Sequence, residues 1–303
     1  MLSNLKLLPQ TFKKGLVILK DGNPLILASS TAFFTTFSIA PIILILVNIL
    51  SIYFKSELIS KKLLQNIQTT LGEQPAKQIE SIIMNFQVLE SNIWFTLGGS
   101  VFFAFVATTL LLVIQQSIHI LWHISIKSTV SWRMNFIERF KALVLILSLG
   151  LLFMASQLLD ALVILLYTYL HSLIPSLGTI YLRTLNISLS SVVIIMWITT
   201  LFKYLPDAKV KWEVAFAGGI LTGLLYMLGK FILHKILIHS NVATIFGASA
   251  SFALILLFIF YSSFIVYYGA SFTYAYGENV GKPIIPGKYA DLYIEQIIET
   301  DEI

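Results

Sequence analysis

Cysteine and charged residues are scarce in this chain, and each shortage narrows what the protein can do. None of the 303 residues is cysteine, which excludes a disulfide framework, a thiolate metal site and a cysteine nucleophile. Charged residues make up 12% of the chain, about half of the roughly 25% found in soluble domains. Hydrophobic residues make up 57% and the mean hydropathy is +0.86, so the sequence predicts a protein embedded in lipid.

Recurrent motifs of enzymes are also missing from the sequence. It contains no G-x-S-x-G elbow, no P-loop and no zinc-ligand spacing. The basic residues are scattered, the net charge is only +5, and no basic stripe interleaved with aromatic residues is present. We therefore expect no enzymatic activity, no cofactor, no bound metal and no nucleic-acid partner.

Uncharged or nearly uncharged runs of sequence indicate six transmembrane helices, since a spanning helix needs about 20 apolar residues. The expected spans are residues 28–54, 93–124, 142–171, 184–204, 213–238 and 248–276. The longer ones must tilt or extend beyond the hydrocarbon. The predicted fold class is thus all-α, a polytopic membrane protein with one six-helix domain over residues 1–277 and a cytoplasmic tail over 278–303.

Two amphipathic segments are expected outside these spans. Residues 5–21 place Phe12, Leu16 and Leu19 on one helical face, which indicates a helix lying on the membrane surface, with a disordered N-terminus as the alternative. Residues 55–92 show helical periodicity on both sides of Gly72-Glu73-Gln74-Pro75, which predicts a periplasmic helical hairpin. The tail after Gly277 is rich in turn residues and then acidic, and we expect it to be mobile and solvated.

The distribution of Lys and Arg predicts the orientation of the chain. Thirteen of the 20 Lys and Arg residues lie in segments 1–27, 125–141, 203–211 and after 276, all on the side of both termini. Because cytoplasmic segments carry the excess of positive charge, both termini are expected in the cytoplasm.

Several polar residues fall inside the expected spans. Gln115, His119 and His123 are spaced four apart, but the residues between the histidines are apolar, so we favour interhelical hydrogen bonds over a metal site. The other intramembrane polar candidates are Asn48, Asp160, Lys230 and His234.

Asp160 is the only acidic residue in the interior of an expected span, and Lys230 falls at a similar depth, about 6–7 Å beyond the midpoint of its helix. A buried carboxylate needs a partner in a membrane, which predicts that the two residues pair. The alternative is that Lys230 extends to the headgroups while Asp160 is protonated or bonded to Ser or Thr.

Two further features concern helix shape and packing. Pro41 should kink its helix and free the carbonyl of Phe37, which Ser38 could satisfy. Ala215, Gly219 and Gly223 lie four apart, a spacing that lets two helices approach closely, either within the fold or between subunits of a homodimer.

Three stretches resemble the YihY/BrkB family of membrane proteins, formerly mislabelled as ribonuclease BN. They are residues 32–41 (AFFTTFSIAP), residues 205–219 (LPDAKVKWEVAFAGG), and residues 246–270, from Phe246-Gly247 through Tyr261 to Gly269-Ala270. The resemblance spans roughly residues 10–277. This chain departs from the family pattern at Phe246, where Tyr is usual, and at Ser271, where Glu is usual.

The resemblance implies a multi-pass protein of the bacterial inner (cytoplasmic) membrane, linked by name to virulence and suspected of transport, and it gives no support for ribonuclease activity. The mid-helix proline and the intramembrane polar residues favour a transporter or translocator of a lipid or other amphiphilic solute, with membrane lipids as partners. The alternatives are a non-transporting scaffold that organises envelope proteins and, last, a membrane-embedded enzyme. Substrate, energy source, direction of transport and oligomeric state stay open.

Overall fold

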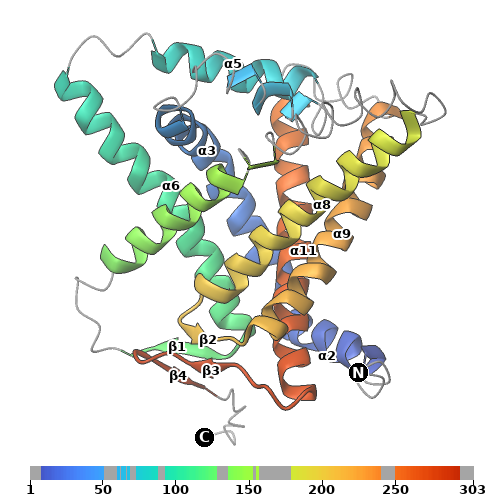
Figure 1. Ribbon diagram of the computed structural model, residues 1–303. Helices are drawn as coiled ribbons and strands as arrows, with labels where there is room; N and C mark the ends of the chain where they lie inside the picture. Colours follow the sequence, from blue (N-terminus) through green and yellow to red (C-terminus); the bar gives the residue numbers. More distant parts are fainter. Residues whose placement is uncertain are drawn as a thin grey trace, which may run out of the picture.

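The computed structural model describes residues 8–50, 60–61, 63–65, 67–68, 73–87, 93–127, 136–152, 155–156, 179–239 and 250–293. Within them, long helices form a bundle with four short strands gathered at one end (Figure 1). The helices are α2 (Leu8–Asp21), α3 (Pro24–Leu50), α5 (Glu73–Gln87), α6 (Ile93–Leu121), α8 (Thr179–Tyr204), α9 (Trp212–His239) and α11 (Ala250–Asn279), and residues 136–152 are also helical. The strands are β1 (Ile124–Ile126), β2 (Ala208–Lys209), β3 (Ile285–Pro286) and β4 (Ala290–Leu292).

Four of the described helices are long and apolar enough to cross a membrane: Pro24–Val47, Val101–Leu121, Trp212–Ile232 and Phe252–Asn279. They coincide with the first, second, fifth and sixth spans expected from the sequence, which confirms the all-α membrane class. In the region of the fourth, α8 carries a shorter apolar stretch, Ser191–Tyr204. Most of the third expected span, 142–171, lies outside the described residues.

Helix α9 lies between α8 and α11 and meets each of them through small residues. A Cβ atom on Gly219 would meet the side chain of Thr199 and lie 3.1 Å from the carbonyl oxygen of Ile195, both on α8. Ala215 on the same face is fully buried, and Gly223 also lies against Ile195. The face of small residues at 215, 219 and 223 is thus covered by α8 within the fold, where it allows close van der Waals packing.

The contact between α9 and α11 is reciprocal. Thr222 of α9 lies over Gly269 of α11, and Thr273 of α11 lies over Gly218 of α9. Each threonine donates its hydroxyl to the carbonyl of the glycine one turn earlier in its own helix, at 2.7 and 2.6 Å. The hydroxyls therefore need no water, and the two backbones come close without leaving a polar group unsatisfied.

Helix α2 packs on the end of α11 near the strands. Thr11, Gly15, Ile18 and Leu19 are buried, and the Phe12 and Phe272 rings are 5.0 Å apart. The expected helix over residues 5–21 is therefore present from residue 8, but Leu16, which the pattern placed on its packing face, is 54% exposed. The reason is that α11 covers a face centred on Gly15, whose small size allows the backbone of Phe272 to approach.

At the opposite end of the bundle, α5 lies across α3 and α11 (Figure 1). Ile79 of α5 is buried with Val47 of α3 and Ile259 of α11, and Leu63 and Ile67 pack against this group. Helical segments therefore do form within residues 60–68 and 73–87, and Glu73-Gln74-Pro75 form the first turn of α5 rather than a break between helices.

The four strands form two antiparallel pairs, β1 with β4 and β2 with β3. They join the segment after α11 to the end of α6 and to the loop between α8 and α9. The expectation of a mobile tail is therefore wrong for residues 285–292, because their backbone is paired with strands that follow other helices. Residues 294–303 lie outside the described part of the chain.

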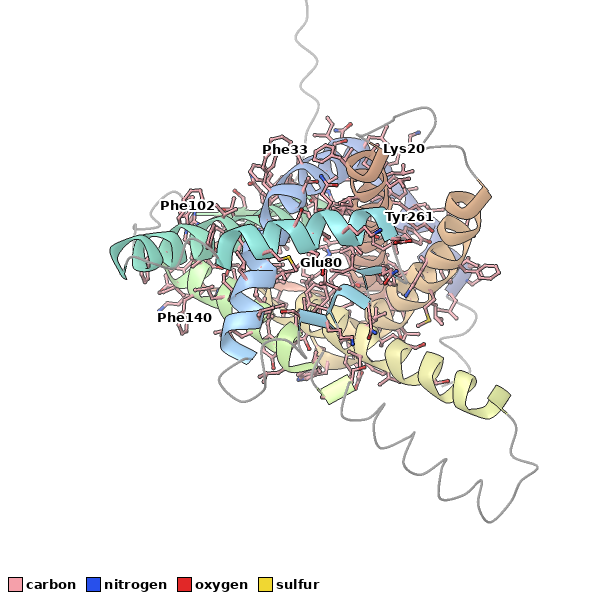
Figure 2. All side chains as sticks on the ribbon, turned by 90° about the horizontal axis from the view of Figure 1, so that it is seen from above. Lys20, Phe33, Glu80, Phe102, Phe140 and Tyr261 are labelled. Atoms are coloured by element: carbon pink, nitrogen blue, oxygen red, sulfur yellow. The ribbon has the colours of Figure 1, made fainter. Side chains whose placement is uncertain are left out.

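Large apolar side chains cover the outside of the bundle, as expected for helices that face lipid. Phe33, Phe102 and Phe140 lie at its rim when it is seen from above (Figure 2), and they are between 55% and 63% exposed. The interior of the bundle holds Trp122, which follows α6, Phe202 of α8 and Tyr267 of α11, none of which is exposed.

Gly219→Leu should lower the folded yield and the thermal unfolding midpoint in detergent, since no space exists between Gly219 and α8 for a larger side chain. Ile220→Leu on the same helix, at a position 36% exposed, conserves volume and is the matched control. Equal yields and midpoints for the two variants would contradict the close contact between α8 and α9.

Candidate functional site

A cluster of polar side chains is buried where the helices approach the strands. Asp207, in the loop between α8 and β2, accepts hydrogen bonds from Lys141 (Oδ1, 3.0 Å) and Gln115 (Oδ2, 3.2 Å). Glu138 accepts from the same two donors, through Oε1 from Lys141 at 2.6 Å and through Oε2 from Gln115 at 2.7 Å. Two carboxylates are therefore bridged by one ammonium and one amide.

The cluster is mostly shielded from solvent. The side chains of Glu138 and Asp207 are 9% and 10% exposed, and that of Lys141 is 38% exposed. Burial disfavours the charged ammonium, but the hydrogen bonds to both carboxylates outweigh this effect and raise the pKa of Lys141. Lys141 therefore stays charged at neutral pH and balances one of the two carboxylates.

His119 fixes the backbone of the same loop. Its Nε2 atom accepts a hydrogen bond of 2.9 Å from the backbone N–H of Asp207. An acceptor nitrogen carries no proton, so the neutral ring has its proton on Nδ1. Because Gln115 and His119 lie one turn apart on α6, one face of this helix holds both the backbone and the side chain of Asp207.

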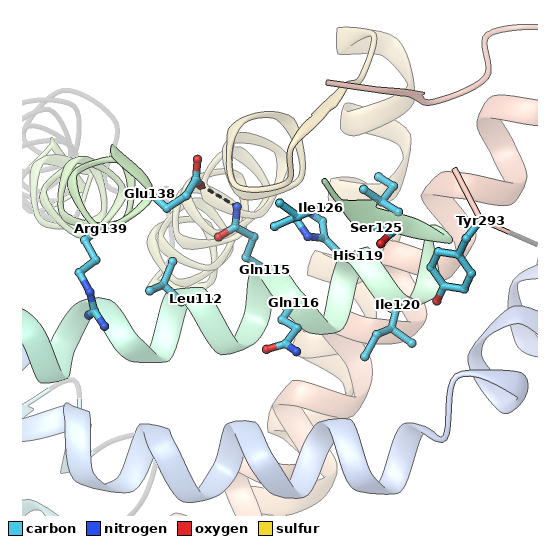
Figure 3. A pocket seen from close by; sticks show the side chains of 11 residues that line it. Leu112, Gln115, Gln116, His119, Ile120, Ser125, Ile126, Glu138, Arg139 and Tyr293 are labelled. Carbon is cyan, nitrogen blue, oxygen red and sulfur yellow. Dashed lines mark hydrogen bonds between the residues drawn. The ribbon is translucent and has the colours of Figure 1, made fainter. Parts of the chain in front are cut away.

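A pocket of about 620 Å³ adjoins the cluster (Figure 3). Its lining residues come from α6, β1 and the 136–152 helix, together with Tyr293, which follows β4. They include both polar and apolar side chains. The lining residues are Leu112, Gln115, Gln116, His119, Ile120, Ile124, Ser125, Ile126, Glu138, Arg139 and Tyr293. Such a mixed lining suits a ligand with both a polar and an apolar part.

Arg139 lies at the edge of this pocket and reaches back along α6. Its Nη1 atom donates to the carbonyl of Phe105 at 3.2 Å and to the hydroxyls of Thr108 and Thr109 at 3.1 and 3.3 Å. The guanidinium also lies 3.9 Å from the centroid of the Phe105 ring. The contacts fix the side chain against a helix whose apolar face is exposed.

The sequence predicted two members of this site, Gln115 and His119, and the structure gives both of them hydrogen bonds to other segments. His123, which the sequence grouped with them, lies beyond the end of α6 with a positive φ of 54° and has the Tyr274 and Tyr293 rings beside it. Among the described residues, no three His, Asp or Glu side chains gather in a way that could hold a metal ion.

Other predicted site residues lie elsewhere or cannot be placed. Asp160 and the side chains of Asn48 and His234 fall outside the described residues. Lys230 is half-buried on α9, and no carboxylate of the described part of the chain contacts it, so its pairing with Asp160 stays a prediction.

The expectation for Ser38 is wrong. Helix α3 continues through Pro41, but Ser38 donates to the carbonyl of Val106 on α6, at 3.0 Å, rather than to a carbonyl freed near the proline. Its hydroxyl therefore links two helices.

Sequence reasoning missed Glu138, Lys141 and Asp207 as site residues because they lie outside the expected spans. One signal was available. Acidic residues just outside an expected span, as Asp207 and Glu138 are, can meet polar residues near the end of a neighbouring helix.

Residues 20–288 match the family model described as Virulence factor BrkB. The chain belongs to this family. No curated protein and no solved structure matches it. The part of this BrkB-family chain that matches begins near the end of α2 and includes β3, so Gln115, Glu138 and Asp207 all lie within it.

Lys141→Met should lower the stability of the protein by about 1–3 kcal/mol, less than for a fully buried pair because Lys141 is partly exposed. The variant leaves the carboxylates of Glu138 and Asp207 close together without a cation between them, and they repel each other. Adding Glu138→Gln removes one of these charges and should restore part of the lost stability. The measurement is thermal unfolding in detergent. Lys13→Met, at an exposed position of α2, is the control and should have little effect. Additive losses in the double variant would show that Lys141 does not bridge the carboxylates.

Proposed function

We propose that this BrkB-family membrane protein is a transporter or translocator of a lipid or other amphiphilic solute, and not an enzyme. The observation that supports the proposal is the pocket beside Gln115, His119 and Glu138. It is lined both by polar groups and by Leu112 and isoleucines. A solute with a polar head and an apolar tail matches such a lining.

The pocket also lies beside surfaces that face lipid. Phe105 and Ile120 of α6 are 54% and 36% exposed, and Phe136 and Phe140 of the neighbouring helix are 71% and 63% exposed. An amphiphile could therefore reach the polar cluster with its apolar part still in contact with the membrane.

The full proposal includes six spans, a periplasmic position for α5 and the inner membrane as the location. Basic residues support the orientation, because ten of those in the described part of the chain lie at the strand end. Five lie toward the α5 end: Lys61, Lys77, Arg183, Lys230 and Lys235. The basic residues at the strand end are Lys13, Lys14, Lys20, Lys127, Lys141, Lys203, Lys209, Lys211, Lys282 and Lys288. Excess positive charge favours the cytoplasm, so the strand end and both termini are placed there.

Reporter fusions test this orientation in cells. Fusions after residue 303 and at residue 130 should report the cytoplasm, and a fusion near residue 72, before α5, should report the periplasm. A cytoplasmic signal at residue 72 would contradict the six-span arrangement.

The competing proposal is a scaffold that organises envelope proteins without moving any solute. The buried polar cluster is compatible with it, since Glu138, Lys141 and Asp207 also hold helices together. The pocket favours transport, because a scaffold needs no cavity beside its polar groups.

Transport is tested by reconstituting the purified protein into vesicles that contain a fluorescent phospholipid, with and without an imposed pH gradient. The protein should increase the rate at which inner-leaflet lipid becomes accessible to an external quencher. Gln116→Trp should abolish most of that increase by filling the pocket.

Gln78→Trp is the matched control, since it makes the same change at an exposed position of α5, at the other end of the bundle. A wild-type rate equal to that of protein-free vesicles under both conditions would contradict phospholipid translocation and favour the scaffold.

A further inference from the structure

Arg139 is a cation whose described contacts are all with neutral groups. Its three hydrogen bonds go to one carbonyl and two hydroxyls, and its ring contact is with Phe105. Within the described part of the chain, no carboxylate lies within ion-pair distance of it. The acidic residue next to it in sequence, Glu138, is already bound by Gln115 and Lys141.

The position of the guanidinium makes this lack of a counter-ion costly. Thr109, which it contacts, lies about 18 Å along the helix axis from Leu121 at the end of α6, at 1.5 Å per residue. This is within the stretch Val101–Leu121 that is apolar enough to span a membrane. A charge at that level is expensive unless an anion or a water-filled cavity accompanies it.

The side chain also keeps donors that its described hydrogen bonds do not use. All three hydrogen bonds use Nη1, so Nε and Nη2 keep donors for a further partner. A guanidinium matches a phosphate group with two parallel hydrogen bonds. The contacts to α6 hold the group in place, so little side-chain entropy would be lost on binding.

Exposed aromatic side chains lie on the two helices that carry and contact this cation. Phe102, Phe105, Phe136 and Phe140 are all more than half exposed, and Leu112 lines the adjoining pocket together with Arg139. The combination of one unneutralised cation with an exposed aromatic surface is complementary to an anionic headgroup that carries acyl chains.

We propose that Arg139 binds the phosphate of a phospholipid, whose acyl chains lie against the exposed phenylalanines of α6 and the 136–152 helix. The proposal rests on the proposed function and names its substrate class. Arg139 acts here as a binding residue, and the Glu138–Lys141–Asp207 cluster positions the helix that carries it.

Equilibrium binding tests the proposal without any need for transport. A fluorescent phosphatidylglycerol is titrated into the full-length protein in detergent and then displaced by unlabelled competitors. Phosphatidylglycerol should compete at least about tenfold better than diacylglycerol of the same chains, since the latter lacks the charged acceptor. Glycerol 3-phosphate should compete far more weakly, because it has the phosphate without the acyl chains.

Variants then assign the effect to Arg139. Arg139→Gln should weaken phosphatidylglycerol binding by about tenfold or more, and Arg139→Lys should recover part of the affinity because it keeps the charge without the fork. Lys288→Gln is the control, since it removes an equal charge at the exposed strand end and should leave the affinity unchanged.

Equal competition by phosphatidylglycerol and diacylglycerol with the wild-type protein would overturn the proposal even if Arg139→Gln fails to fold. Equal competition by glycerol 3-phosphate would show a site for free phosphate instead of lipid. Lipid binding without translocation would leave this inference standing and contradict only the proposed function. Translocation by a protein that binds phosphatidylglycerol and diacylglycerol equally would contradict this inference and leave the proposed function standing.

Discussion

Asp207 is the residue on which the strand end of the molecule depends, because its polar groups together bond to three other segments of the chain. Its carboxylate accepts from Lys141 of the 136–152 helix and from Gln115 of α6, and its N–H donates to His119. Its carbonyl accepts from Gly287 of the C-terminal segment at 2.8 Å. Leaving any of these groups unpaired in a buried site would cost free energy, so they hold the four segments in one arrangement.

The strands follow from the same arrangement. Gly287 must be small, since a Cβ atom there would lie 2.9 Å from the carbonyl oxygen of Asp207. Its position sets the pairing of β3 with β2 and brings Tyr293 near the end of α6, where Tyr293 donates its N–H to the carbonyl of His123. These contacts therefore fix the segments that line the pocket, whose lining mixes polar with apolar side chains.

Much of the fold could be predicted from the sequence because the membrane imposes it. A run of about 20 apolar residues has few alternatives to a spanning helix, which is why α3, α6, α9 and α11 lie near their expected positions. Small residues four apart on α9 marked its contact with α8. The reciprocal contact of Gly218 and Thr222 with Gly269 and Thr273 gave no comparable signal, because it requires two helices to be in register.

The polar contacts were less predictable, for a physical reason. Gln115 and His119 could be identified as polar residues in an apolar helix, but their partners Glu138 and Asp207 come from segments 23 and 92 residues away from Gln115. Ser38 bonds to α6 because that helix is close, and local geometry alone favoured its own helix. The strands after α11 are two or three residues long, too short for an alternating pattern to be visible.

A structure of the protein in a lipid bilayer that contains phosphatidylglycerol tests most directly whether the frame around Asp207 supports an amphiphile site. We expect Glu138, Lys141 and Asp207 to be joined as described, with a lipid phosphate within hydrogen-bonding distance of Arg139 and acyl chains beside Phe102 and Phe140. A pocket closed by the protein's own side chains, with Arg139 paired to one of its carboxylates, would contradict the proposed site.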